Sequence, residues 1–140
     1  MKKKIIITFF VFLSINLFSQ KEITGLWLNQ DNDAEIKITQ KQNKYYGEIT
    51  WLLKPNNEKG HPKKDTKNPD PQKQNQKILG LEIIKNLEFS KKEWSKGTIY
   101  DPKTGKTYKL YAKIKDKKLH LRGYVGVSLI GKTNTWTRVK

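Results

Sequence analysis

Acidic side chains are the first residues of this sequence that could take part in catalysis. Asp65 and Asp101 could serve as a general acid and a general base if folding brought their carboxyl groups together. The sequence gives no distance between them, no serine stands in a G-x-S-x-G pattern, and no Ser/His/Asp set can be identified. We therefore favour a protein without enzymatic activity and keep catalysis by this pair as the open alternative.

The residue types that bind metals and nucleotides form no recognised pattern. His61 and His120 are the only histidines and the chain has no cysteine, which is a poor ligand set for a transition metal. The segment Asp101–Thr107 reads D-P-K-T-G-K-T, like the end of a phosphate-binding loop. It lacks the glycine that this motif needs five residues before Gly105, where Tyr100 stands. We predict a hairpin turn there, and neither a metal nor a cofactor.

The N-terminus predicts export from the cytoplasm. Three lysines at positions 2–4 precede an apolar run from Ile5 to Phe18, and Ser19 offers a small residue for cleavage. This order is typical of a secretory signal peptide, which we assign to residues 1–20. We therefore expect an exported protein, periplasmic or extracellular, with no transmembrane segment after cleavage.

The charge of the chain predicts its partners in outline. Its 29 lysines and arginines outnumber 13 acidic residues, which gives a formal net charge of +16. Only Arg122 and Arg138 are arginines, and a lysine-rich surface is first of all a hydrated one, because the ammonium group is strongly solvated. An anionic component of the cell envelope is the alternative interpretation, whereas export argues against nucleic acid.

Residues 21–140 have the pattern of a single all-β domain. Apolar and polar side chains alternate in several segments, which indicates half-buried strands, and no amphipathic helix is apparent. The predicted strands are residues 34–40, 45–53, 78–85, 97–100, 106–114, 119–125, 129–131 and 133–139. Every second residue from Tyr45 to Leu53 is expected to share one face, and residues 89–94 are interpreted as a turn. We predict a small antiparallel β-barrel of about eight strands, because closure removes exposed strand edges.

One polar segment interrupts the alternation. Residues 54–77 are rich in lysine, asparagine and glutamine and contain four of the five prolines. Proline at that density excludes a strand inside a sheet, so we predict a loop. A loop of this length within a compact domain is usually either functional or disordered.

A pair of residues from the two ends of the domain predicts how the barrel closes. Gly25 and Trp27 stand near the start of the mature chain and Arg138 near its end. A guanidinium group stacked on an indole can join the first and last strands of a barrel. We therefore predict a structural role in barrel closure for these three residues.

A wider resemblance covers nearly the whole mature chain. Gly25-x-Trp27 with a terminal-strand arginine resembles the signature of lipocalin-like (calycin) barrels. An ordered series of short motifs also resembles domain of unknown function family 2147, a bacterial family of exported proteins. These motifs are Lys64-Asp65-x-x-Asn68-Pro69, Leu79-Gly80, Trp94-x-x-Gly97, Ile99-Tyr100-Asp101-Pro102-x-x-Gly105-Lys106-x-Tyr108, Leu121-Arg122-Gly123-Tyr124 and Gly131-x-Thr133-x-x-Trp136-x-Arg138. The resemblance implies a small barrel in the envelope without an established activity, and it makes the polar loop a candidate rim of a site.

Two functions follow from these observations. The favoured one is a binding module that holds a small apolar or amphipathic molecule, as barrels of about eight strands can. The residues expected at its wall are Tyr100, Tyr108, Tyr124 and Trp136. The polar residues expected at its rim are Asp65, Asn68, Asp101 and Arg122. The alternative is a non-catalytic accessory protein with a filled core, which would act through its basic surface on a protein or an anionic envelope polymer; a monomer is expected in either case.

Overall fold

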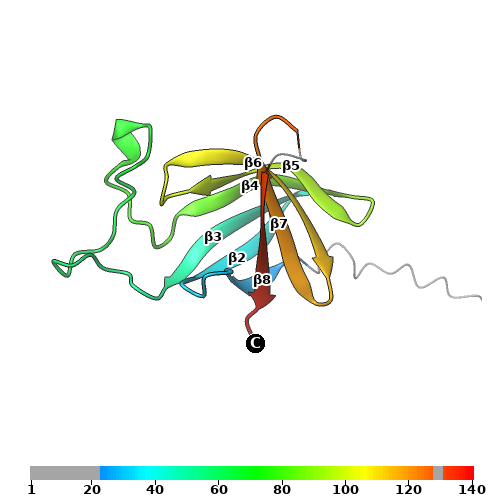
Figure 1. The fold of residues 1–140 in the computed structure, drawn as a ribbon, viewed down its shortest axis with the longest axis horizontal. Helices are drawn as coiled ribbons and strands as arrows, with labels where there is room; N and C mark the ends of the chain where they lie inside the picture. Colours follow the sequence, from blue (N-terminus) through cyan, green and yellow to red (C-terminus); the bar gives the residue numbers. More distant parts are fainter. Residues whose placement is uncertain (1–22, 128–130) are drawn as a thin grey trace, which may run out of the picture.

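Eight antiparallel strands form a closed barrel in the computed structural model, which describes residues 23–127 and 131–140 (Figure 1). The strands are β1 (Gly25–Leu28), β2 (Ala34–Lys41), β3 (Lys44–Leu52), β4 (Glu82–Ser90), β5 (Glu93–Asp101), β6 (Lys106–Lys115), β7 (Lys118–Tyr124) and β8 (Gly131–Arg138). A short 3-10 helix, η1 (Pro71–Lys73), lies between β3 and β4. The predicted all-β barrel is therefore confirmed, whereas the signal peptide assigned to residues 1–20 lies outside the described residues.

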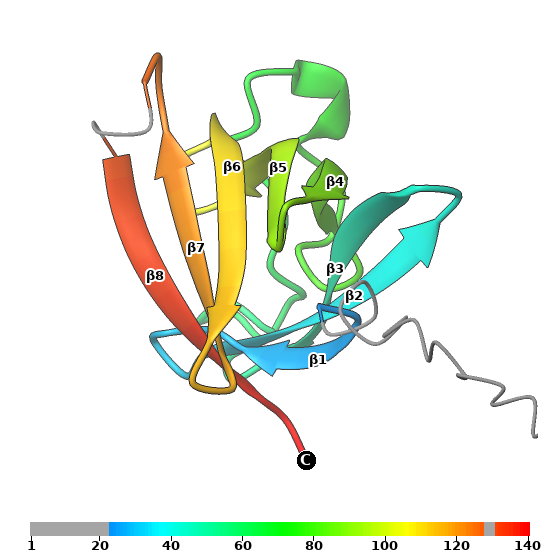
Figure 2. The ribbon, with the colours of Figure 1, turned by 90° about the vertical axis from the view of Figure 1, so that its right-hand side faces the viewer.

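The ring closes between the first and last strands. Each strand pairs with the next along the chain, and β8 pairs with β1 through Trp27 opposite Arg138 and Leu28 opposite Thr137 (Figure 2). A closed ring leaves none of these strands with an unpaired edge. Within the part of the chain that the structure describes, no helix has the length and apolar character needed to cross a membrane.

The turn predicted at residues 89–94 is much shorter than expected. Phe89 of β4 is the cross-strand partner of Trp94 in β5, and their rings lie 4.8 Å apart between centroids. Only Lys91 and Lys92 make the turn, with φ angles of 51° and 67°. Such a two-residue turn matches the twist of the flanking strands but usually carries asparagine or glycine. Because lysines stand at these two positions instead, the sequence carried no signal for a two-residue turn.

The alternation predicted for residues 45–53 is wrong in its last part. Glu35 of β2 lies opposite Trp51, but the next residue, Ile36, lies opposite Ile49. The extra residue on β3 is a β-bulge, which reverses the face that later side chains present. Trp51 is therefore 39% exposed and Leu53 57% exposed instead of facing the core.

The two ends of the barrel differ because of their connections. Two-residue turns join β2 to β3, β4 to β5 and β6 to β7 at one end, which we call the closed end. Large side chains fill the barrel there, and the completely buried aromatic ones are Trp27, Tyr45 and Trp94. The other end, the open end, carries residues 29–33, 102–105 and the long connection 53–81, which stands out from the barrel (Figure 1).

Candidate functional site

A cavity of about 960 Å³ occupies the open half of the barrel. Its deeper wall is apolar, with Ile36, Ile49, Leu110, Leu121 and Trp136 among the lining residues. These side chains face inward because they alternate with outward polar residues along their strands. The cavity lies in the size range of sites for small molecules, which are mostly apolar with a few polar groups.

All four residues predicted for the wall line this cavity: Tyr100, Tyr108, Tyr124 and Trp136. Tyr108 lies beside Gly123 of the neighbouring β7, where an added Cβ would come within 3.4 Å of the Tyr108 Cβ. An alanine at position 123 would therefore be in ordinary van der Waals contact with the tyrosine. Asp101, predicted for the rim, also lines the cavity. Binding by these residues stays a prediction.

Arg122, predicted for the rim, is not among the residues that line the cavity. It stands between Leu121 and Gly123, which line the cavity, so the two-residue period of β7 directs Arg122 to the outside. Its guanidinium donates a hydrogen bond of 2.8 Å to Thr133 Oγ1 on the neighbouring β8. The predicted contact with a ligand inside the barrel is therefore not supported for this residue.

Asp65 and Asn68 belong to the long connection and do not line the cavity. Asp65 is completely buried. Its Oδ1 accepts a hydrogen bond of 2.6 Å from the Tyr100 hydroxyl, and its Oδ2 accepts one of 2.8 Å from Asn68 Nδ2. Burial and the bond to Asp65 raise the pKa of Tyr100, so the hydroxyl stays a donor. We call these three residues the Asp65 clasp; it ties the long connection to β5.

Backbone contacts extend this attachment. Asp65 N–H donates to the Gln76 carbonyl at 2.8 Å, which closes the loop on itself. On the other side, Gly105 of the β5–β6 turn has a φ of 74°, and a Cβ there would lie 2.0 Å from the Lys67 carbonyl oxygen. Only glycine permits this conformation and this approach without strain. The predicted loop is therefore a folded structure that packs against the neighbouring turn.

The two carboxylates considered for catalysis are both engaged in local hydrogen bonds. Asp65 accepts the two side-chain hydrogen bonds of the Asp65 clasp. Asp101 accepts hydrogen bonds from the Lys103 backbone N–H at 2.9 Å and from Thr104 Oγ1 at 3.1 Å. These last contacts are typical of an aspartate that begins a turn. Across the described residues, no group of three or more metal-binding side chains gathers at one place.

An ion pair crosses the mouth of the cavity. Lys103 Nζ of the β5–β6 turn lies 3.0 Å from Asp33 Oδ2 and 3.7 Å from Asp31 Oδ2, both in the β1–β2 connection. Those connections stand on opposite sides of an eight-strand ring. Partial burial alone would raise the pKa of Asp33, but hydrogen bonds from Asn29 and Lys103 outweigh it and lower that pKa. The same contact raises the pKa of Lys103.

Among the lining residues that the sequence analysis missed are two polar ones on β8. Lys132 and Asn134 of β8 line the cavity together with Trp136. They stand opposite Gly123 and Leu121 of β7. Their spacing of two from Trp136 was the available signal, because every second residue of a strand shares a face. They supply an ammonium group and an amide group to the lining of the cavity.

Barrel closure has the geometry expected from the sequence. The Arg138 guanidinium lies 4.2 Å from the centre of the Trp27 ring, and its Nη1 donates to the Thr24 carbonyl at 2.9 Å. The Trp27 indole N–H donates to the Ile23 carbonyl at 2.8 Å. A Cβ at Gly25 would lie 2.8 Å from Arg138 Nη1, which explains the glycine. These residues join β1 to β8 at the closed end, away from the cavity.

Comparison with known proteins agrees with this geometry. A model of the bacterial family described as "Uncharacterized protein conserved in bacteria (DUF2147)" matches residues 25–138. The chain belongs to the DUF2147 family. The matched region begins at Gly25 and ends at Arg138, which are two of the three residues predicted to close the barrel.

One solved structure resembles this DUF2147 chain closely in fold. It is protein HP1028 from the human pathogen Helicobacter pylori, described as belonging to the lipocalin family. The two chains share 22% sequence identity with a TM-score of 0.73, over 84% of this chain and 82% of the other. At this identity the likeness shows a lipocalin-like fold. A search among curated proteins found no match.

Proposed function

We propose that this protein is a binding module whose barrel holds a small apolar or amphipathic molecule. The observation that carries the proposal is the cavity of about 960 Å³ with an apolar inner wall and polar groups at its mouth. Trp27, Tyr45 and Trp94 fill the closed end without lining the cavity, so an elongated apolar group would enter from the open end only. Its burial would provide the main free energy of binding.

The positions of apolar and polar residues in the cavity indicate which kind of ligand fits. Apolar side chains dominate the depth of the cavity, whereas Asp101, Lys103 and Lys132 lie among the polar lining residues. A molecule with an apolar body and one polar end matches this distribution, because both ends then keep suitable partners. A molecule polar along its whole length would lose water contacts inside the barrel without replacement.

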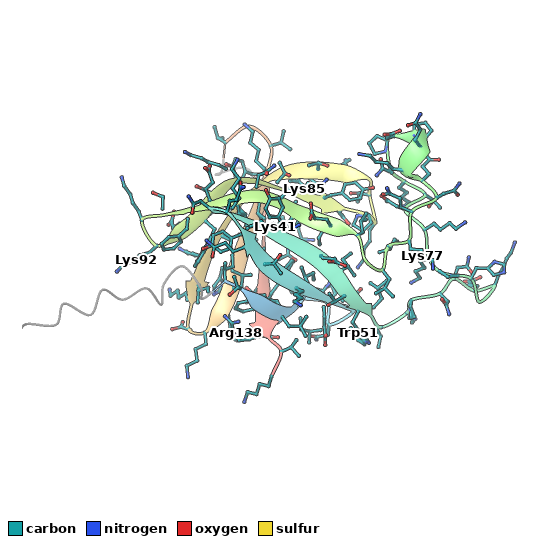
Figure 3. All side chains as sticks on the ribbon, turned by 180° about the vertical axis from the view of Figure 1, so that it is seen from behind. Lys41, Trp51, Lys77, Lys85, Lys92 and Arg138 are labelled. Carbon is teal, nitrogen blue, oxygen red and sulfur yellow. The ribbon has the colours of Figure 1, made fainter. Side chains whose placement is uncertain are left out.

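The alternative, an accessory protein with a filled core, finds less support. A cavity of this size does not fit a filled core. The lysine-rich surface on which that alternative depends is present, with exposed lysines such as Lys41, Lys85 and Lys92 on the outside of the barrel (Figure 3). We propose that this surface keeps an exported, monomeric protein soluble in the periplasm or outside the cell.

Native mass spectrometry of the purified protein, after incubation with a lipid and metabolite extract of the bacterial envelope, tests the proposal. We expect a discrete added mass at one-to-one stoichiometry, lost when the extract is depleted of amphiphiles. Bare protein under every condition would count against a binding module. The value of an added mass would begin to identify the ligand.

A further inference from the structure

A second hollow adjoins the mouth of the barrel. It is a groove of about 620 Å³ between the long β3–β4 connection and the β5–β6 turn. Its charged lining residues are Lys63, Lys64, Lys67 and Lys103, with His61 beside them. No carboxylate of the described chain lines it. We call it the lysine groove.

The lysine groove is continuous with the barrel cavity. Four residues, Lys63, Ile78, Pro102 and Lys103, line both hollows. A molecule that occupies the barrel and projects from its mouth on this side therefore meets the groove directly. The two hollows also differ in character, since the first has an apolar wall and the second a cationic one.

The positive charge of the groove is mostly uncompensated. Lys103 pairs with Asp31 and Asp33, but within the described parts of the chain Lys63, Lys64 and Lys67 form no salt bridge. Three ammonium groups without acidic partners attract a group that carries more than one negative charge. A phosphate ester, with a charge of about −1.5 to −2 at neutral pH, meets that requirement better than a single carboxylate.

The groove lysines are placed by a folded backbone. Lys64 directly precedes the buried Asp65, and the Lys67 carbonyl packs against Gly105. Asn57 Oδ1 accepts hydrogen bonds of 3.0 Å from the backbone N–H groups of Lys59 and His61, which shapes the other side of the groove. Lysines on a fixed framework lose less conformational entropy on binding than lysines on a loose loop.

We propose that the lysine groove binds the phosphate-bearing head of an amphiphile whose apolar part occupies the barrel. This inference rests on the proposed function and names the ligand class more closely. The barrel supplies contacts to the apolar chain, and the groove selects molecules with a dianionic head over those with a neutral one. The long connection of this chain is therefore part of the binding site.

The test compares three probes below their micelle-forming concentrations: dodecyl phosphate, dodecyl maltoside and inorganic phosphate. Binding of each is measured by calorimetry with the wild type and with the double variant Lys64→Gln/Lys67→Gln. The control variant Lys113→Gln/Lys115→Gln removes the same charge from exposed positions of β6 toward the closed end. We expect the groove variant to bind dodecyl phosphate about tenfold more weakly, with dodecyl maltoside unaffected and the control variant like the wild type.

Other results would overturn the inference in distinguishable ways. If both detergents bind equally well, or the groove and control variants weaken dodecyl phosphate equally, the groove is not a head-group site although the barrel still binds. Inorganic phosphate binding as tightly as dodecyl phosphate would show a site for the free anion instead. If neither detergent binds, the proposed function itself fails.

Discussion

The buried carboxylate of Asp65 provides the sharpest prediction about stability. Tyr100→Phe removes the hydroxyl that donates to Asp65 Oδ1 at 2.6 Å and leaves Asn68 as the remaining side-chain donor of the clasp. Because Asp65 is completely buried, water cannot replace the lost donor without opening the loop. A hydrogen bond to a charged group contributes about 1.5–3 kcal/mol, so we expect a loss of that size in the free energy of unfolding.

Urea denaturation measures this loss, and Tyr46→Phe is the matched control. Tyr46 donates a hydrogen bond of 3.1 Å to Asn86 at an exposed site, where water can take its place. We expect that variant to lie within about 0.5 kcal/mol of the wild type. Limited trypsin digestion should also cut the lysine-rich connection 54–77 faster in Tyr100→Phe. If both variants behave alike in both assays, the reasoning about the clasp is refuted.

The pH dependence of the same variant has a definite sign. Burial and the bond to Asp65 raise the pKa of Tyr100 above its unfolded value, near 10. The stability contributed by the protonated hydroxyl is therefore complete below about pH 10 and is lost as the pH rises further. The stability difference between wild type and Tyr100→Phe should shrink at high pH. A difference that grows instead would contradict this assignment.

Three further predictions concern other parts of the barrel. Arg138→Met should lower the free energy of unfolding by about 1–2 kcal/mol, because the guanidinium no longer covers the buried indole; an unchanged melting temperature would contradict the closure contact. Gly97→Ala should lower the free energy of unfolding by about 1–3 kcal/mol, because a Cβ there would lie 2.6 Å from a backbone carbonyl oxygen of β4. Gly123→Ala is the control and should be tolerated, because the nearest contact of its Cβ would be at 3.4 Å. Asp33→Asn should lower the free energy of unfolding by about 1 kcal/mol or less at neutral pH, as measured by urea denaturation. Because the pKa of Asp33 is lowered in the folded protein, the stability difference between wild type and variant should vanish as acid protonates the wild-type carboxylate.

The alternation of apolar and polar residues predicted which side chains are buried where strand pairing is regular, and it failed where a β-bulge interrupts the pairing. In β6, Leu110 and Ala112 are buried as their spacing indicates. In β3, the bulge turned Trp51 outward, because pairing with another strand decides where an extra residue is accommodated. No pattern within β3 itself carries that information.

The candidate site was predictable in its wall and, at the rim, only at Asp101. Aromatic residues on inward strand positions, such as Tyr108 and Trp136, could be placed from spacing alone. Asp65 was expected to face a ligand, but its role depends on which strand the long connection packs against, and that is set by tertiary contacts. The lysine groove arises from the same packing. Its lysines are scattered among many others in the sequence.

Occupancy of the barrel is the central claim, and titration with a neutral naphthylamine dye tests it most directly. The decisive variant is Asn134→Phe, which places a ring in the cavity opposite Leu121, and the control is Thr137→Phe at an exposed position of the same strand. We predict saturable one-to-one binding by the wild type and the control, and binding about tenfold weaker or more in Asn134→Phe, which corresponds to about 1.4 kcal/mol. Absence of saturable binding by the wild type, or equal binding by all three folded proteins, would contradict the account.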